Sequence, residues 1–149
     1  MIMFWILVIL IAVIDQILKN LVRIYVPLGF SIDTFLPFLK ITNTKNLGAA
    51  FGSLAGMRIY LIVSTLFIIA LVIYYIFKKN IKNLWLLTFL AFVLGGGLSN
   101  LYDRVFYGFV TDYIKLSFFP PVCNLGDYFI CFGTVAVLIF TLKGTAVKK

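Results

Sequence analysis

The sequence has no histidine and no glutamate, and its acidic side chains are five aspartates among 149 residues. Ser-His and Cys-His nucleophiles need an imidazole base, and an ordinary zinc site needs histidine or glutamate ligands that this chain lacks. We therefore expect no metal and no cofactor. A Ser-Lys dyad remains open, with Ser53 or Ser99 beside a lysine such as Lys19 or Lys45, although no spacing favours it.

Cysteine is almost as scarce. Cys123 and Cys131 are eight positions apart, which on one helix is ~12 Å of rise. Because a disulfide reaches only ~7 Å between Cα atoms, we expect none. Cys131 is expected to be a small buried apolar residue, with a reactive thiol as the alternative.

Charged residues make up only 12% of the chain and hydrophobic residues 63%, the composition of an integral membrane protein. The apolar residues form four blocks near the ~20 residues needed to cross a bilayer. The expected spans are residues 2–22, 59–77, 84–101 and 122–142. We predict an all-α bundle of four transmembrane helices that forms a single membrane-embedded domain over residues 1–149. The first block lacks a preceding basic residue and a small-x-small cleavage site, so it is expected to remain as an anchor.

The net charge is +8, and many of the lysines lie at the edges of the expected spans. One group separates the second and third spans and another ends the chain: Lys78, Lys79, Lys82, Lys143, Lys148 and Lys149. Basic residues concentrate in cytoplasmic loops, so both termini are expected to be cytoplasmic. Lysines at membrane edges indicate anionic membrane lipids as partners and no nucleic acid.

Two long connections, about 27–56 and 102–121, are rich in aromatic residues and do not read as polar linkers. Such segments are expected on the membrane surface or against the helix ends. Apolar and polar residues alternate at 39–42 and at 110–116, with the period of two that is typical of strands. We therefore predict a small extracytoplasmic β-rich element.

Three of the five aspartates, Asp103, Asp112 and Asp127, fall within a 25-residue window. A charge near the bilayer centre costs ~3 kcal/mol on insertion scales, so acids in so apolar a chain are candidates for function. In an extended segment Asp112 shares a face with Val110 and Ile114, where desolvation favours the neutral acid. Asp127 has a structural alternative, because aspartate near a helix N-terminus caps the helix and suits its dipole.

Asp112 and Asp127 are expected at the same membrane face, on either side of a short Pro120-Pro121 break. Two neighbouring carboxylates share a proton and titrate as a pair. The ionised member can take a proton from water while the protonated member donates to a carbonyl oxygen. This is the chemistry of an aspartic peptidase, and we expect Asp112 to hold the shared proton.

Further polar residues accompany this pair. Asp15 and Lys19 are four positions apart and can neutralise each other on one helix face; a purely structural pair is the alternative. Asn100, Asp103 and Arg104 lie toward one side of the third span.

Glycines accompany these polar residues. Gly95, Gly96 and Gly97 permit close approach of another helix or a bound peptide. The segment from Asn46 through Gly48 to Gly52 sets an amide beside small residues, which indicates either close backbone approach or a tight turn.

Together these segments resemble the bacterial lipoprotein signal peptidases, or signal peptidase II. The matching motifs, in chain order, are Asp15-Gln16 with Lys19; Asn46-x-Gly48-Ala49-Ala50-Phe51-Gly52; Gly95-Gly96 through Asn100 with Asp103-Arg104; Gly108-x-Val110-x-Asp112-Tyr113-Ile114; and Asn124-x-x-Asp127. The chain departs from the usual family pattern at Ser99, Cys123 and Gly126.

The resemblance implies an aspartic endopeptidase of the cytoplasmic (inner) membrane, with its active site near the outer face. It would remove signal peptides from diacylglyceryl-modified prolipoproteins before the lipidated cysteine, and cyclic peptides of the globomycin type would inhibit it. By resemblance, Asp112 and Asp127 are the catalytic pair. The residues that would support the site or bind substrate are Asn46, Gly48, Asn100, Asp103, Arg104, Asn124, Asp15 and Lys19.

Two functions of other classes stay open. A small proton-coupled transporter would use the aspartates as protonation sites, although the chain has no internal repeat and few spans. A non-catalytic membrane chaperone would tolerate the loss of either Asp112 or Asp127.

Overall fold

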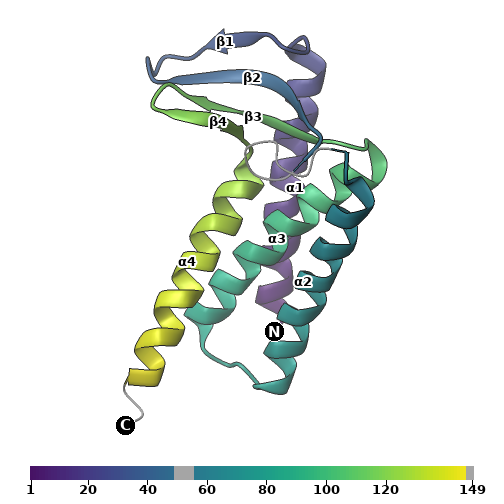
Figure 1. Cartoon of the computed structure of the whole chain (residues 1–149). Helices are drawn as coiled ribbons and strands as arrows, with labels where there is room; N and C mark the ends of the chain where they lie inside the picture. Colours follow the sequence, from purple (N-terminus) through teal and green to yellow (C-terminus); the bar gives the residue numbers. More distant parts are fainter. Residues whose placement is uncertain (49–55, 147–149) are drawn as a thin grey trace.

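The computed structural model describes residues 1–48 and 56–146, with side chains as far as residue 143. Figure 1 shows a bundle of helices with a small sheet lying across one end. The elements, in order, are α1 (Ile2–Tyr25), β1 (Ser31–Asp33), β2 (Leu39–Asn46), α2 (Arg58–Lys78), α3 (Leu84–Phe106), β3 (Val110–Leu116), β4 (Phe119–Cys123) and α4 (Leu125–Ala146).

All four helices are long and apolar enough to cross a membrane, which confirms the expected fold class. Their bounds differ from the predicted spans by more than one residue at four ends, one of which is the end of α4, at Ala146 instead of residue 142. The first helix continues to Tyr25, and α3 continues past Leu101 to Phe106 because its polar residues find partners inside the protein. The fourth helix begins only at Leu125, since Val122 and Cys123 belong to β4.

The sheet has the order β1-β2-β3-β4, and all of its neighbouring strands are antiparallel. β2 and β3 confirm the two predicted strands. Sequence analysis missed β1, which has only three residues and is wholly exposed, and β4, which contains Pro120 and Pro121. Proline cannot donate to a strand ladder, so it suits β4's place at the sheet edge.

The interior contains two apolar clusters with a polar layer between them. Phe4, Val8 and Leu94 belong to the cluster far from the sheet. Val22 and Tyr113 belong to the cluster beneath the sheet. Between these two clusters α1 buries charged residues, including Asp15 and Lys19, whose side chains are both 0% exposed.

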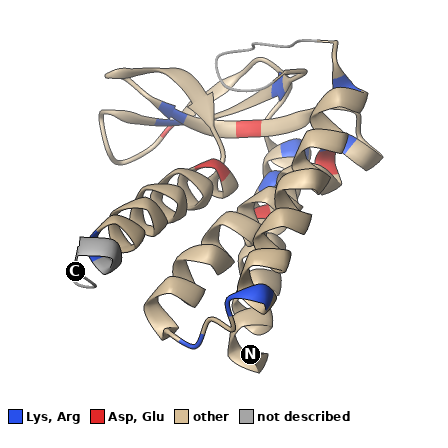
Figure 2. Ribbon diagram, turned by 60° about the horizontal axis from the view of Figure 1, so that its bottom comes forward, with Lys and Arg blue, Asp and Glu red and all other residues tan. Residues whose placement is uncertain are grey.

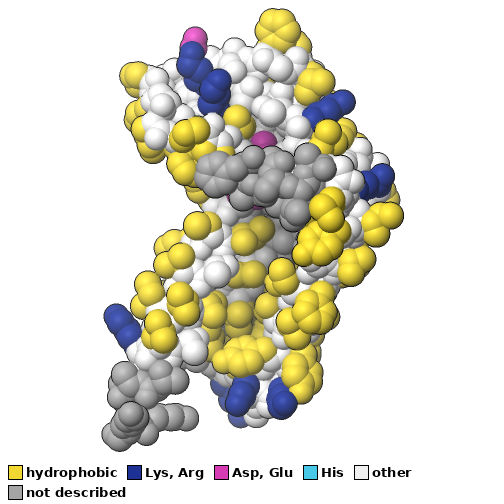
Figure 3. Space-filling model, viewed as in Figure 1, with side chains coloured by type: hydrophobic (Ala, Val, Ile, Leu, Met, Phe, Trp, Pro, Cys, Tyr) yellow, Lys and Arg dark blue, Asp and Glu magenta, His cyan; other side chains and the backbone are white. Residues whose placement is uncertain are grey.

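The outer faces of the helices are covered with hydrophobic side chains, as Figure 3 shows for one face of the molecule. Cys131 in α4 is exposed and lines a cavity, so the expectation that it is buried was wrong. Cys123 and Cys131 form no disulfide, as predicted. An exposed apolar surface of this extent is what a bilayer covers.

Both termini lie at the end of the bundle opposite the sheet (Figure 1). Among the described residues, charged side chains at that end are basic, whereas acidic ones occur near the sheet (Figure 2). The basic residues at that end include Lys78, Lys79, Lys82 and Lys143.

Two of the three consecutive glycines in α3 allow close helix packing. A Cβ on Gly95 would meet the Val8 carbonyl oxygen at 2.9 Å, and one on Gly96 would collide with the carbonyl of Gly126 in α4. Gly97 is different, because a Cβ there meets nothing within 4 Å and the residue lines a cavity. Helix packing therefore explains the first two glycines but not the third.

Candidate functional site

Asp112 and Asp127 come from different elements and share one polar residue. Asp112 lies in β3 and Asp127 in the first turn of α4. Between them, Asn124 donates from Nδ2 to Asp112 Oδ1 at 2.7 Å and from its backbone nitrogen to Asp127 Oδ2 at 3.1 Å. The structure therefore brings the two predicted carboxylates to one site.

The same asparagine caps α4. Its Oδ1 accepts a hydrogen bond from the Asp127 backbone nitrogen at 2.9 Å, while the Asp127 carboxylate accepts from the Asn124 backbone nitrogen. This reciprocal arrangement is a capping box. The capping role expected for Asp127 and its place beside Asp112 therefore exist together, and the cap fixes the position of the carboxylate.

Each carboxylate also receives an amide from another element. Asn46, at the end of β2, donates to Asp112 Oδ2 at 2.8 Å, and Asn100 in α3 donates to Asp127 Oδ1 at 2.8 Å. Asn46 is oriented in turn by Gly48, whose backbone nitrogen donates to Asn46 Oδ1 at 2.9 Å. Four elements therefore converge on the pair.

The pKa of Asp112 is raised from its ordinary value of 3.8 to about 7. Burial is the main cause, and the nearby Asp127 charge adds to it; hydrogen bonds from Asn46 and Asn124 act in the opposite direction. The direction agrees with the expectation that Asp112 is desolvated. Burial also raises the pKa of Cys123 to about 11, which keeps that thiol protonated and argues against a reactive thiol at Cys123.

Lys19 is the centre of the buried polar layer. Its Nζ lies 2.8 Å from Asp15 Oδ2 and 3.6 Å from Asp103 Oδ2, with all three side chains 0% exposed. It also donates to Asn100 Oδ1 at 2.7 Å and to Ser99 Oγ at 3.2 Å. The predicted Asp15–Lys19 pair is therefore part of a larger network that reaches Asn100 and, through it, Asp127.

Asp103 supports the site without a hydrogen bond to Asp112 or Asp127. It accepts hydrogen bonds from Gln16 Nε2 at 3.0 Å, Arg23 Nη1 at 3.2 Å and the backbone nitrogen of Thr111 at 2.9 Å. Arg23 also donates to Thr111 Oγ1 at 2.9 Å. These contacts fix the start of β3, one residue before Asp112.

Arg104 is oriented toward the end of β2. Its Nη2 donates to the Gly48 carbonyl at 3.1 Å and its Nη1 to the Asn100 carbonyl at 3.4 Å. The rest of the small-residue motif, residues 49–52, lies outside the described residues. Arg104 therefore joins α3 to the part of the motif that the structure describes.

A cavity of about 490 Å³ opens between α2, α3, α4 and the sheet. Its polar lining includes Asn46, Asn100, Arg104 and Asp127, and most of the remaining lining is apolar. Asp112 is only 2% exposed and is not on the cavity wall, but Asn46 is, and it donates to Asp112. The carboxylate pair thus has one accessible member and one buried member.

Ser99 and Lys19 are close enough to form a Ser-Lys dyad, but their other contacts argue against one. Ser99 and Lys19 are in contact, but Ser99 is 1% exposed and its hydroxyl donates to Asp15. The Lys19 ammonium is paired with Asp15 and Asp103, so it is not a free base. Lys45 lies over the Phe109 ring, and Ser53 is outside the described residues.

Tyr113 is a supporting residue that sequence analysis did not select. Its hydroxyl donates to Asp15 Oδ1 at 3.1 Å and accepts from the Leu125 backbone nitrogen at 3.2 Å. It therefore links α1 to the start of α4. Its position directly after Asp112 was a usable signal, but nothing in a single sequence shows where a tyrosine hydroxyl points.

Among the residues that the structure describes, no group of three or more histidine, cysteine, aspartate or glutamate side chains is placed to hold a metal ion. The chemistry available at the site is that of two carboxylates held by amides. One is partly accessible from a mostly apolar cavity and the other has a pKa near neutrality.

Comparison with known proteins gives a consistent result. A family model described as Signal peptidase (SPase) II matches residues 7–143. The lipoprotein signal peptidase of Staphylococcus aureus (strain MRSA252) is 30% identical over 142 residues, covering 93% of this chain and 87% of that protein; the protein from strain JH9 gives the same values.

Two solved structures are also similar. A bacterial membrane enzyme determined by the in meso method at 2.3 Å resolution has a TM-score of 0.92 and 29% identity, with 99% of this chain and 92% of the other covered. A second such enzyme, determined at 1.9 Å, has a TM-score of 0.86 and 28% identity, with 95% and 93% covered.

Proposed function

Because the chain belongs to the signal peptidase II family, we propose that it removes signal peptides from diacylglyceryl-modified prolipoproteins, cutting before the lipidated cysteine. We further propose that it is an aspartic endopeptidase with Asp112 and Asp127 as its catalytic pair. The observation that carries this assignment is Asn124, which donates a hydrogen bond to each carboxylate.

The difference in exposure between the two carboxylates supports a division of labour. Asp127 lines the cavity and is only partly buried, so its ionised form can reach water. Asp112 is buried and its pKa is about 7, so it holds the shared proton near neutral pH.

In the proposed reaction Asp127 takes a proton from water as the oxygen attacks the scissile carbonyl carbon. Asp112 gives its proton to the carbonyl oxygen in the same stage. The tetrahedral intermediate then collapses as the proton on Asp127 passes to the leaving nitrogen, and Asp112 recovers a proton from the hydroxyl group. Both carboxyls return to their starting states.

The polar residues around the pair have proposed supporting roles. Asn46, Asn100 and Asn124 fix the carboxylates by direct hydrogen bonds. Arg104 lines the cavity, where it can hold a substrate backbone, and Gly48 positions it by accepting a hydrogen bond from Arg104 Nη2. The set that supports this arrangement from inside the bundle is Asp15, Lys19 and Asp103.

The mostly apolar cavity suits a substrate that arrives from the bilayer as an apolar signal segment with acyl chains. Globomycin-type cyclic peptides are proposed to occupy the same cavity. The chain is a multi-pass membrane protein, and the basic residues at the end opposite the sheet support cytoplasmic termini and a site near the outer face. We regard the helices and sheet as one peptidase domain, without a cofactor.

No observation favours the transporter or chaperone alternatives. A proton path across a membrane is built from ionisable groups at successive depths. Here, among the described residues, the acids on the helices and on β3 occur in the half of the bundle near the sheet.

The test is cleavage of a diacylglyceryl-modified prolipoprotein by purified wild type, Asp112→Asn and Asp127→Asn, with substrate binding measured in parallel. Asp33→Asn is the matched control, because Asp33 is 81% exposed at the sheet edge, where its carboxylate pairs with Lys40. We expect both site variants to bind substrate without cutting it, and the control to cut normally. Cleavage near the wild-type rate by either site variant would show that its aspartate is structural.

A further inference from the structure

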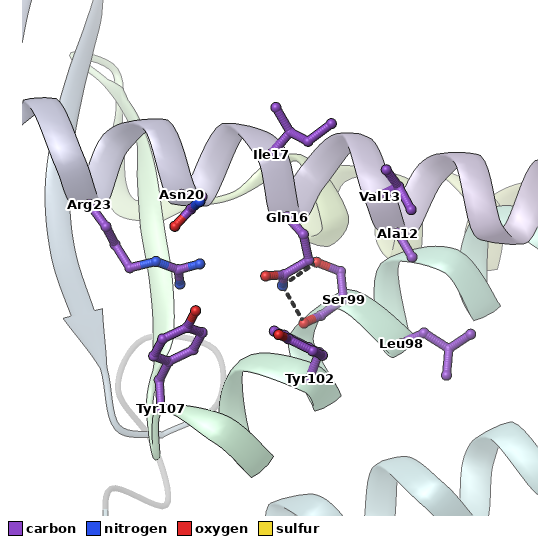
Figure 4. Close-up of a pocket in the computed structure, with 10 residues that line it drawn as sticks. All are labelled: Ala12, Val13, Gln16, Ile17, Asn20, Arg23, Leu98, Ser99, Tyr102 and Tyr107. Carbon is purple, nitrogen blue, oxygen red and sulfur yellow. Dashed lines mark hydrogen bonds between the residues drawn. The ribbon is translucent and has the colours of Figure 1, made fainter.

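A second cavity, of about 550 Å³, lies between α1 and α3 on a different face of α3 from the site cavity. Figure 4 shows the residues that line it, with Arg23 and Tyr107 at one end and Ala12, Val13 and Leu98 toward the other. We call this cavity the α1/α3 groove. Neither the catalytic pair nor the three amides that hold it line this groove.

The α1/α3 groove changes in polarity along its length. From Ala12 to Arg23 the helix rises ~16 Å, a length comparable to that of a lipid acyl chain. The deep end is apolar, with Ala12, Val13 and Leu98, and the end near the sheet carries Asn20 and Arg23. This gradient matches an amphiphile of the bilayer, with its head near the sheet and its chain toward the membrane interior.

Two polar groups at the sheet end lack partners within the part of the chain that the structure describes. The Nε of Arg23 is buried and has no acceptor there. Asn20 is exposed on the groove wall, and no described residue is recorded as its hydrogen-bond partner. The Arg23 Nε is too buried for a lipid to reach, but the Asn20 amide is open to the bilayer. Unsatisfied polar groups are costly at membrane depth, so an acceptor supplied from the bilayer would stabilise this end.

The charge at this end favours an anion. Arg23 forms an ion pair with Asp103 through Nη1 at 3.2 Å, and its guanidinium lies over the Tyr107 ring. Nη1 also donates to Thr111, and the other nitrogens make no hydrogen bond to a described residue. A smaller cavity of about 330 Å³ also contains Arg23 and adds Lys45. Among the described residues, no acidic side chain lines either cavity. A guanidinium group binds phosphate oxygens well because its donors form a planar fork.

We propose that the α1/α3 groove binds one anionic glycerophospholipid of the surrounding membrane. The phosphate lies at Arg23 and Asn20, and one acyl chain lies along Ala12, Val13 and Leu98. The site is independent of substrate, whose reacting bond must reach a different cavity on the other face of α3.

The test is lipid retention by the purified full-length protein in detergent, measured by native mass spectrometry during titration with phosphatidylglycerol or phosphatidylcholine. Val13→Trp fills the apolar end of the groove, and Asn20→Leu removes a polar contact near the head. Val135→Trp is the matched control, because Val13 and Val135 are 48% and 50% exposed on different helices. Thermal unfolding without added lipid verifies that each variant is folded. Arg23 is left unchanged because it also holds Asp103 and Thr111.

We expect wild type and Val135→Trp to retain one phosphatidylglycerol in preference to phosphatidylcholine. Val13→Trp and Asn20→Leu should each weaken that binding by about tenfold, the effect of losing about 1.4 kcal/mol. Equal retention of both lipids by wild type would reveal ordinary surrounding lipid and overturn the proposal. The proposal would also be overturned if Val13→Trp and Asn20→Leu were folded and retained phosphatidylglycerol as well as wild type does. A third contrary result would be a dimer that displaces lipid from the groove and that Val13→Trp prevents from forming.

Discussion

Lys19 holds the amide of Asn100 in the orientation that presents a donor to Asp127, one of the two proposed catalytic residues. The ammonium donates to Asn100 Oδ1 at 2.7 Å, which leaves Asn100 Nδ2 directed at Asp127 Oδ1, 2.8 Å away. Lys19 itself is fixed by Asp15 and Asp103. A fully buried cation therefore orients a neutral group that contacts a proposed catalytic carboxylate.

Replacing Lys19 with methionine should lower both stability and activity. The change leaves Asp15 and Asp103 without their shared cation, and removing one partner of a buried ion pair costs about 3 to 5 kcal/mol. Asn100 also loses the contact that orients it. Thermal unfolding and prolipoprotein cleavage, measured on the same preparations, check the two effects.

Lys40→Met provides the matched control for this prediction. Lys40 lies 2.8 Å from Asp33, the same distance as Lys19 from Asp15, but the side chains of this second pair are 49% and 81% exposed. Exposed pairs contribute about 0 to 1 kcal/mol, so the control should unfold near the wild-type temperature. If Lys19→Met and Lys40→Met lowered the unfolding temperature equally, burial of the Lys19 ion pairs would not explain the loss of stability.

The raised pKa of Asp112 predicts that activity falls as the pH rises above about 7, where the pair loses its shared proton. Asn46→Ala removes a hydrogen bond that lowers this pKa. The alkaline limb of the pH–rate profile should therefore move to higher pH in this variant. Lys45→Ala, the neighbouring β2 residue whose ammonium contacts Phe109, should leave the limb in place.

The raised pKa of Asp112 also makes the free energy of unfolding depend on pH. Between pH 3.8 and about 7 the folded protein binds the Asp112 proton more tightly than the unfolded chain does. The contribution of this group to the free energy of unfolding therefore decreases as the pH rises through that window. For the activity prediction above, an alkaline limb of the pH–rate profile that lies at lower pH in Asn46→Ala than in wild type would contradict the assigned direction of the Asp112 pKa shift.

Much of the fold was predictable because transmembrane helices are long, uniform and apolar. The errors came where polar residues obtained partners from distant parts of the chain. Asn100 and Asp103 suggested the end of the third span, yet their bonds to Lys19 and Thr111 let the helix continue to Phe106. A pattern within one segment does not contain those partners.

Local sequence patterns were also insufficient to predict every residue of the candidate site. Asp112 and Asp127 were predictable as a pair because carboxylates in an apolar chain are costly and two can share a proton. Tyr113 was not, because its contribution is a hydroxyl bonded to Asp15 and to the Leu125 backbone, 98 and 12 positions away. Cys131 was placed inside because cysteine is usually buried in water-soluble proteins, whereas here it lines an open cavity.

Gly96→Ala should separate α3 from α4. Its Cβ would collide with the carbonyl of Gly126, next to Asp127, and overpacking of this kind costs about 1 to 3 kcal/mol. Gly97→Ala is the control, since its Cβ meets nothing within 4 Å. Thermal unfolding should detect a loss only for Gly96→Ala. If the neighbouring substitution destabilises the protein as much, helix propensity or lipid contact would have to explain the result instead of the α3–α4 contact.

Tyr113→Phe should reduce kcat more than it changes KM. The hydroxyl donates to Asp15 and accepts from the Leu125 backbone nitrogen, so it fixes the start of α4, two residues before Asp127. Its loss leaves the Leu125 nitrogen and Asp15 each without one partner, at a cost of about 1 to 3 kcal/mol. Tyr113 does not line the cavity that is proposed to receive substrate, so binding should persist. Tyr25→Phe, at a tyrosine that is 71% exposed, is the control and should retain wild-type kinetics. A Tyr113→Phe enzyme with unchanged kcat would show that the α4 cap alone positions Asp127.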